Sequence, residues 1–164
     1  MSQTCDSCLQ SKTSLKNNFH CGLCQKHLCK DCAQFLDEDY FSFMKKIPQP
    51  LSHTIYCDPC FREHVAEAQS TYTDLIERAQ KLPIFYKNER NVPLISKSNV
   101  KVTVEDCEDR QEALLRLTFQ AVQQKYNGLT GTEMISKKLI KNGYQKTYWS
   151  GSAFPSNLRE DDVF

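Results

Sequence analysis

The chain has 164 residues, which is enough for one ordinary domain or two small ones. It carries 21 Lys or Arg and 20 Asp or Glu residues, so its formal net charge of +1 gives no global attraction to nucleic acid or to an anionic membrane. No run of 18 apolar residues occurs, and the first residues lack the pattern of a secretory signal. We therefore expect a cytoplasmic protein whose contacts with charged partners are local.

The cysteines are concentrated in the first part of the chain. Eight of the nine form four Cys-x2-Cys pairs, and only Cys107 lies beyond residue 60. In a reducing compartment such pairs are typical metal ligands rather than disulfides. A tetrahedral zinc ion takes two pairs, so four pairs predict two Zn(II) ions in a module of residues 1–64. A module of this size buries too little apolar surface to fold without its metal.

The spacing of the pairs leaves two ways to share the metals. The gaps are 12, 4 and 24 residues, and the gap of four makes a zinc ion shared by the second and third pairs possible but cramped. We favour an interleaved cross-brace. Its ligands are Cys5, Cys8, Cys29 and Cys32 for the first zinc and Cys21, Cys24, Cys57 and Cys60 for the second. His20 and His27 flank these ligands, but four complete pairs leave no vacancy for either ring.

The same spacing resembles that of the FYVE zinc finger family over residues 5–80. The resemblance lies in the order of the first three pairs, in the final Cys57-Asp58-Pro59-Cys60-Phe61 and in the helix that follows. It implies interleaved ligation, and it implies a site for phosphatidylinositol 3-phosphate, which the family binds with an Arg-Arg-His-His-Cys-Arg stretch. The matching residues here are Asn17, Asn18, Phe19, His20, Cys21 and Gly22, and Ile55 replaces a further arginine.

These replacements predict that the standard phosphoinositide pocket is missing. Among the positions matching the basic stretch only His20 is retained, and Leu15 and Lys16 are the remaining candidate lipid contacts. Residues 1–64 contain seven basic and seven acidic side chains, and eight thiolates with two Zn(II) ions leave a charge of about −4. A module of that charge is a poor general phosphate binder.

A helix is expected after the metal module. No Gly or Pro occurs from Phe61 to Leu82, and apolar residues recur there with helical spacing until Pro83 ends the helix. The apolar stripe, residues 65–82, fits either packing within the chain or a two-helix seam between copies. We assign residues 65–92 to this helix and a connector with room for one short strand.

The remainder predicts a small α+β domain at residues 93–158. Val100, Val102 and Val104 alternate with polar residues as in a half-buried strand. Asp109 and Glu112 form a capping box before an apolar helix that Asn127 and Gly128 should end. Two strands, Leu129–Lys141 and Tyr144–Phe154, then flank Asn142-Gly143, a strong hairpin signal. The predicted order is β-α-β-β in an antiparallel sheet, followed by an acidic tail at residues 159–164.

This second domain resembles the YbjQ-type heavy-metal-binding domains of bacteria, which tend to oligomerise. The resemblance lies in the helix, in Tyr126-Asn127-Gly128-Leu129, in the hairpin and in Ser150-Gly151-Ser152-Ala153. Residues 126–158 have no Cys, His or acidic cluster beyond Glu133, so the heavy-metal binding of that family is not assigned to any residue here. Cys107 lacks the partners of a nucleophile and is expected to be an inert thiol.

The sequence thus predicts an α+β protein with a small two-zinc cross-brace module, a connecting helix and a small β-α-β-β domain. The expected function is that of a non-catalytic adaptor that binds a protein partner, with two zinc ions as cofactors and no nucleic acid. A membrane phosphoinositide and peripheral attachment to membranes stay open as weaker possibilities. Two alternatives remain: a RING-type ubiquitin ligase, whose Cys-x-His-x2-Cys centre is not present here, and an oligomer organised by residues 65–82 or by the C-terminal domain.

Overall fold

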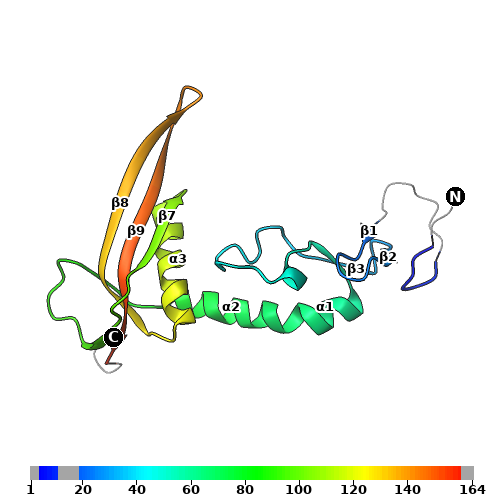
Figure 1. Ribbon diagram of the computed structural model, residues 1–164, viewed down its shortest axis with the longest axis horizontal. Coiled ribbons are helices and arrows are strands. Elements are labelled where there is room, and N and C mark those ends of the chain that lie inside the picture. Colours follow the sequence, from blue (N-terminus) through cyan, green and yellow to red (C-terminus); the bar gives the residue numbers. More distant parts are fainter. Residues whose placement is uncertain (1–3, 11–18, 160–164) are drawn as a thin grey trace. The chain divides into compact units, whose positions relative to one another are not determined.

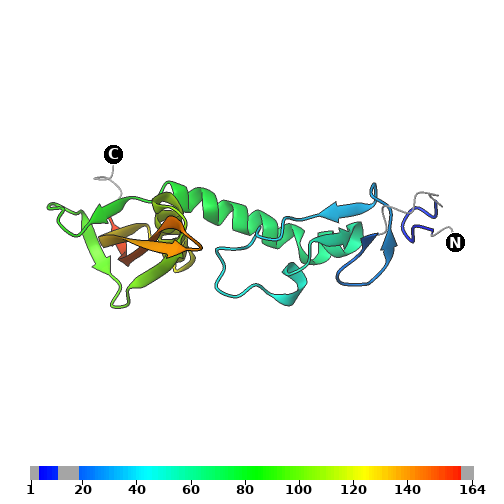
Figure 2. The ribbon, with the colours of Figure 1, turned by 90° about the horizontal axis from the view of Figure 1, so that it is seen from above.

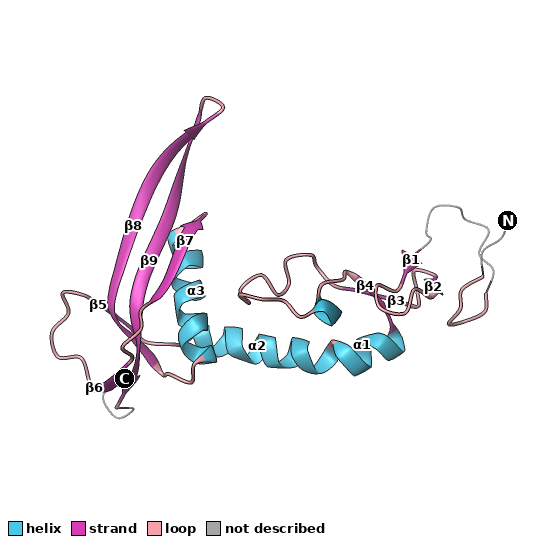
Figure 3. Cartoon of the chain, in the orientation of Figure 1, coloured by secondary structure: helices cyan, strands magenta, loops and turns pink. Residues whose placement is uncertain are grey.

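The computed structural model describes residues 4–10 and 19–159, and it divides the chain into two compact units, Met1–Tyr72 and Thr73–Phe164. The candidate lipid contacts Leu15 and Lys16 lie outside the described residues, as does the tail after Arg159. Figures 1 and 3 label the α-helices and β-strands. The elements are β1 (Phe19–His20), β2 (His27–Leu28), β3 (Ala33–Phe35), the 3-10 helix η1 (Gln49–Leu51), β4 (Ile55–Cys57), α1 (Asp58–His64), α2 (Ala66–Gln80), β5 (Ile84–Tyr86), β6 (Leu94–Lys97), β7 (Val102–Cys107), α3 (Arg110–Gln123), β8 (Gly128–Lys141) and β9 (Tyr144–Leu158). The fold class is α+β, as predicted.

The first unit has very little regular structure. Its two sheets are two-stranded and antiparallel, β1 with β2 and β3 with β4, and loops make up most of the rest (Figure 3). One small buried cluster contains Cys21, Leu28, Ala33 and Cys57. Two of these four residues are candidate metal ligands, so cysteine sulfurs form part of the interior of this unit, beside buried aromatic side chains such as Phe41 and Tyr56.

The predicted helix over residues 61–82 is two helices instead of one. Helix α1 begins earlier than predicted, because Cys57 is extended and Pro59 suits the first turn of a helix. At Val65 the backbone deviates to φ −115°, but the Val65 amide still donates to Phe61 and the Gln69 amide to Val65. Helix α2 therefore continues almost directly from α1 (Figures 1 and 2).

The long gap before the last cysteine pair holds aromatic residues that pack on α2. The rings of Tyr40 and Phe41 lie 5.7 and 5.1 Å from the ring of Tyr72. The Phe43 amide donates to the Tyr72 hydroxyl at 3.3 Å. Val65, Tyr72 and Ala79 of the predicted apolar stripe are all buried. The chain itself covers the stripe at Tyr72, which favours the intramolecular alternative at this position.

The second unit is a five-stranded sheet with one helix against it. The strand order is β5-β8-β9-β6, and β7 also pairs with β9. Ala113, Leu117 and Ala121 of α3 join a buried cluster with residues from the sheet, which are Val102, Val104, Cys107, Leu129 and Ala153. The cap of α3 is the predicted one, since the Asp109 carboxylate accepts from the Glu112 amide at 2.7 Å.

Several details of the predicted second domain are wrong. The connector contains one short strand, β5, as expected, but β5 pairs with β8 in parallel, so the sheet is mixed rather than antiparallel. A further strand that was not predicted, β6, precedes β7 and pairs with β9. Val100 is 72% exposed and precedes β7 instead of packing in it. Asn127 and Gly128 do not end α3. Lys125, at φ 65°, has the left-handed conformation after the helix, and Asn127 forms two hydrogen bonds with the Leu158 backbone.

The predicted hairpin is present and is the longest feature of the sheet. Strands β8 and β9 pair from Gly128 with Ser156 to Lys141 with Tyr144, and Asn142 and Gly143 turn the chain with φ of 53° and 79°. Both values are positive, as the type I′ turn of an Asn-Gly hairpin requires. The hairpin extends past the ends of the neighbouring strands, which Figure 1 shows for β7.

Candidate metal centre

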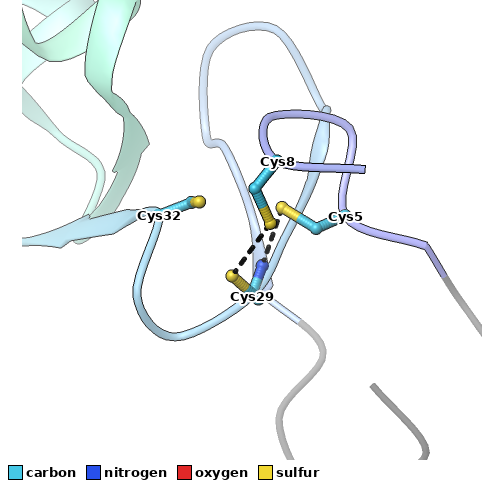
Figure 4. A group of neighbouring side chains, drawn as sticks. All are labelled: Cys5, Cys8, Cys29 and Cys32. Carbon is cyan, nitrogen blue, oxygen red and sulfur yellow. Dashed lines mark hydrogen bonds between the residues drawn. The ribbon is translucent and has the colours of Figure 1, made fainter. Parts of the chain in front are cut away.

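The eight paired cysteines gather in two separate groups of four. One group is Cys5, Cys8, Cys29 and Cys32, and the other is Cys21, Cys24, Cys57 and Cys60. Within each group the sulfur atoms lie within 4.8 Å of one another. In Figure 4 the four side chains of the first group come from two separate loops, and their sulfurs face one another. This membership is that of the interleaved alternative and not of a metal shared by the second and third pairs.

The distances between sulfurs fit a tetrahedral metal. The Cys8 and Cys29 sulfurs are 3.8 Å apart, and the Cys24 and Cys57 sulfurs are 3.6 Å apart. A zinc ion with Zn–S bonds of about 2.3 Å needs sulfurs about 3.8 Å apart, whereas a disulfide needs about 2.05 Å. All nine cysteines are free thiols. The two groups are therefore positioned to bind two metal ions, consistent with two zinc ions.

The first cysteine pair of each group lies on the same kind of turn. The Leu9 amide donates to the Cys5 carbonyl at 2.8 Å, and the Gln25 amide donates to the Cys21 carbonyl at 2.9 Å. Leu9 and Gln25 both have positive φ, 58° and 61°. Each is the residue directly after the second cysteine of its pair. This repeated turn directs both sulfurs of a Cys-x2-Cys pair to one side, where a single ion can reach them.

The second cysteine pair of each group comes from different local structure. Cys29 and Cys32 lie on a turn in which the Cys32 and Ala33 amides donate to the Cys29 carbonyl, both at 3.1 Å. Cys57 ends β4 and Cys60 lies in the first turn of α1. Strands β3 and β4 pair Ala33 with Cys57, so one small sheet links the two groups.

Protonation in the groups is uneven. Burial alone would raise the pKa of the Cys5 thiol, but backbone amides, that of Cys29 first, donate to its sulfur and lower this pKa to about 6. Backbone amides of Cys24 and Cys57 likewise overcome burial at Cys21 and lower its pKa to about 6. The pKa of Cys32 is raised to about 12, first by its hydrogen bond with Cys29. Burial, and then a hydrogen bond with the Cys57 side chain, raise the pKa of Cys60. Four adjacent thiolates repel one another, and a divalent ion in their midst compensates that charge.

Two of the positions that would form a phosphate pocket, Phe19 and Ile55, lie beside an exposed aromatic residue, Phe35. Phe19 packs edge-on against Phe35 with 5.0 Å between ring centroids, and Phe35 pairs with Ile55 across β3 and β4. Phe35 is 52% exposed. We call Phe19, Phe35 and Ile55 the aromatic patch. Phe19 and Ile55 pack against the buried cluster that contains Cys21 and Cys57, so the patch lies beside the second cysteine group.

Two further positions of the expected lipid site can be compared. His20 is exposed on β1, where its ring lies 5.4 Å from that of His27. A Cβ atom on Gly22 would lie 2.3 Å from Cγ of His53, so no larger residue fits there unless His53 moves. The site that the structure describes thus offers His20 but no room for a long basic side chain at position 22.

The sequence did not predict the role of Tyr56, which holds the loop beside the second cysteine group. Its side chain is fully buried, and its hydroxyl donates to the Pro50 carbonyl at 2.9 Å and accepts from the His53 amide at 3.1 Å. Burial raises the pKa of this hydroxyl. Tyr56 fixes the loop before β4, which carries His53 against Gly22. An aromatic residue before a cysteine is too common a pattern to reveal such a role.

The second unit contains neither a metal group nor a reactive thiol among its described residues. Cys107 is buried, its pKa is raised by that burial, and its sulfur contacts the Glu105 carbonyl at 3.7 Å. A groove of about 550 Å³ lies on the sheet and is lined by residues that include Tyr86, Lys87 and Glu133. The two cysteine groups are the only sets of three or more potential metal ligands that lie close together in the described residues.

Comparison with protein-family models, with curated proteins and with solved structures gave no match for this chain. The zinc-finger-like character of the first unit therefore rests on the geometry of its cysteines. No helix in residues 4–10 and 19–159 is long and apolar enough to cross a membrane.

Proposed function

We propose that this protein is a non-catalytic adaptor whose FYVE-like two-zinc module holds a binding surface for a protein partner. The observation that carries the proposal is the pair of four-cysteine groups with interleaved membership. A site closed by four thiolates has no free coordination position for water or substrate, which is the arrangement of structural rather than catalytic zinc. The role of the metals is then to hold β1, β3 and β4 in place.

The aromatic patch supports a protein partner over a phosphoinositide. Two of its three residues, Phe19 and Ile55, occupy positions at which the FYVE resemblance would place basic side chains. Phosphate recognition relies on charge-assisted hydrogen bonds of about 1.5 to 3 kcal/mol each, and apolar side chains supply none of them. Exposed aromatic residues such as Phe35 are instead typical anchors of protein interfaces.

The binding surface can be tested with a photo-crosslinking amino acid at position 35 of the full zinc-loaded chain in its host cells. We expect a discrete protein adduct that disappears when zinc is chelated. The same amino acid at Glu38, an exposed position in the next loop, is the matched control. Identical adducts at both positions, or an adduct that survives chelation, would contradict the proposal.

Two further measurements separate the alternatives. Titration of the chain with the phosphatidylinositol 3-phosphate headgroup at physiological salt should give no micromolar affinity, and such an affinity would refute the loss of the lipid pocket. A ubiquitin-transfer assay with a panel of conjugating enzymes should give no product. Ubiquitin chains that depend on intact cysteine groups would establish the ligase instead.

A further inference from the structure

The end of the β8–β9 hairpin has no neighbouring strand in the part of the chain that the structure describes. Strand β5 pairs with β8 only as far as Thr132, and β7 pairs with β9 only from Trp149 onward. We call residues 135–148 the lysine hairpin. Within it the two strands form five residue pairs, from Lys137 with Tyr148 to Lys141 with Tyr144, a length of about 17 Å at 3.3 Å per residue in which neither edge pairs with another described strand.

The charged side chains of the lysine hairpin are all positive. Between Glu133 and Glu160 the sequence has no Asp or Glu, while the lysine hairpin contains Lys137, Lys138, Lys141 and Lys146. Only Lys146 among the described side chains is neutralised, by Glu108 at 2.5 Å. No carboxylate among the described residues forms an ion pair with Lys137 or Lys138. A protein with a net charge of +1 thus concentrates positive charge on one projecting element.

The same element exposes large apolar side chains close to its turn. Ile140 is 78% exposed and Tyr144 is 82% exposed, and Ile135 and Leu139 are also exposed. Lysines alone would be explained by the need to keep a free strand edge from pairing with other chains. That need does not explain Ile140 and Tyr144, which gain nothing from contact with water. The combination of the two kinds of side chain therefore points to a surface that is both anionic and apolar.

We propose that the lysine hairpin docks on an anionic lipid membrane. Lipid headgroups would attract Lys137 and Lys138, and the boundary between headgroups and acyl chains would accept Ile140 and the amphipathic ring of Tyr144. Nucleic acid fits less well, because the hairpin has no arginine for bidentate contacts with phosphate or guanine, and its aliphatic side chains would stay in water. This inference concerns the second unit and does not depend on the adaptor proposal.

The test is co-sedimentation of the full zinc-loaded chain with two kinds of vesicle, phosphatidylcholine alone and phosphatidylcholine with phosphatidylserine. We expect binding only to the serine-lipid vesicles and a decrease as salt increases. Changing Lys137→Gln together with Lys138→Gln should lower the partition coefficient roughly 10- to 30-fold, because each lysine near the surface changes membrane binding by about tenfold or less. Ile140→Gln with Tyr144→Gln should also weaken it.

Matched controls keep the test specific. Lys45→Gln with Lys46→Gln removes the same charge from another exposed Lys-Lys pair, and Ile95→Gln removes an exposed strand isoleucine of the same unit. Both should bind like the original chain, and thermal melting should show that every variant folds. Equal binding to both vesicles, or equal losses in hairpin and control variants, would overturn the proposal. So would binding to duplex DNA or RNA at physiological salt without vesicle binding.

Discussion

At the scale of single residues, the eight cysteines have identical chemistry but not identical surroundings. Cys5, Cys21, Cys29 and Cys57 are buried, whereas Cys8 and Cys24 are exposed. Backbone amides lower the pKa of Cys5 and Cys21 to about 6, so these two thiols lose a proton more readily than an ordinary cysteine. Each group thus has a buried thiol that readily becomes the thiolate a metal requires.

The interleaved membership gives a sharp prediction for paired cysteine substitutions. Cys5→Ser with Cys29→Ser removes two ligands from one group, so this variant should keep one tightly bound zinc ion per chain. Cys5→Ser with Cys21→Ser removes one ligand from each group and should leave no intact four-thiolate site. Native mass spectrometry of the zinc-loaded chains measures the difference. If the first variant lost both ions, Cys5 and Cys29 would belong to different sites and the interleaved membership would be wrong.

A second prediction at this scale concerns Glu133 and pH. The Lys87 ammonium, 2.6 Å away, and then Lys101, at 3.5 Å, hold the pKa of this carboxyl below its ordinary value of 4.5. A depressed pKa stabilises the fold above the ordinary pKa, and this stability is lost as pH falls through the lower folded-state value. Glu133→Gln should therefore make the melting temperature of the second unit less sensitive to pH below about 4.5.

The fluorescence of Trp149 provides the measurement, because it is the only tryptophan and packs against the core of the second unit. Melting curves between about pH 6 and about pH 3 would be compared for both chains. Glu105→Gln is the control, since Glu105 forms no ion pair in the described part of the protein. The same change in pH sensitivity in both variants would rule out the specific role of the Glu133 ion pairs.

At the scale of elements, the turn and the helix cap that depend on neighbouring residues could be predicted, whereas the pairing of β5 with a distant strand could not. The turn at Asn142-Gly143 and the Asp109 cap depend on residues a few positions apart, and both are present. Strand β5 has three residues in a segment rich in Pro, Asn and Lys, and its order comes from pairing with β8 far along the chain. No local pattern encodes that partner. Gly128 does not end the helix as predicted. A glycine is required there because a Cβ atom would lie 2.3 Å from Cδ1 of Leu158.

The same division holds for the metal site. The four Cys-x2-Cys pairs were sufficient to predict two metal ions, because each tetrahedral ion takes two pairs. Spacing alone left two ways to share the pairs, and the two groups in the structure have the membership of the favoured, interleaved one. The aromatic patch was not predicted. Phe35 reaches Phe19 only because β3 and β4 bring it there, and its exposure depends on how the surrounding loops fold.

The hairpin turn supports a prediction that separates the units. Gly143 has φ 79°, a conformation that costs a β-branched residue about 1 to 2 kcal/mol. Gly143→Val should lower the stability of the second unit by about that amount, seen as a lower midpoint in Trp149 fluorescence, with two zinc ions retained. Gln145→Val places the same side chain on an exposed strand position and should have little effect. Equal effects of both changes would contradict the argument from the turn.

At the scale of the whole molecule, the two units obtain their stability from different sources. The first depends on cysteine groups and small sheets, and the second has an apolar core shared by α3 and its strands. Removal of zinc with a chelator should therefore unfold the first unit while the Trp149 transition of the second keeps its midpoint. Circular dichroism reports the loss in the first unit. A midpoint that moved with chelator would mean that the second unit needs the metal module in order to fold.

The interleaved order of the cysteines also fixes the order in which the sites can be completed during synthesis. Cys32 leaves the ribosome before Cys57, so the first group has all its ligands while the second still has only Cys21 and Cys24. Those two thiols lie inside the segment from Cys8 to Cys29 that the first ion closes. The order of the cysteines therefore allows the first site to be completed while the second still has only one of its two pairs.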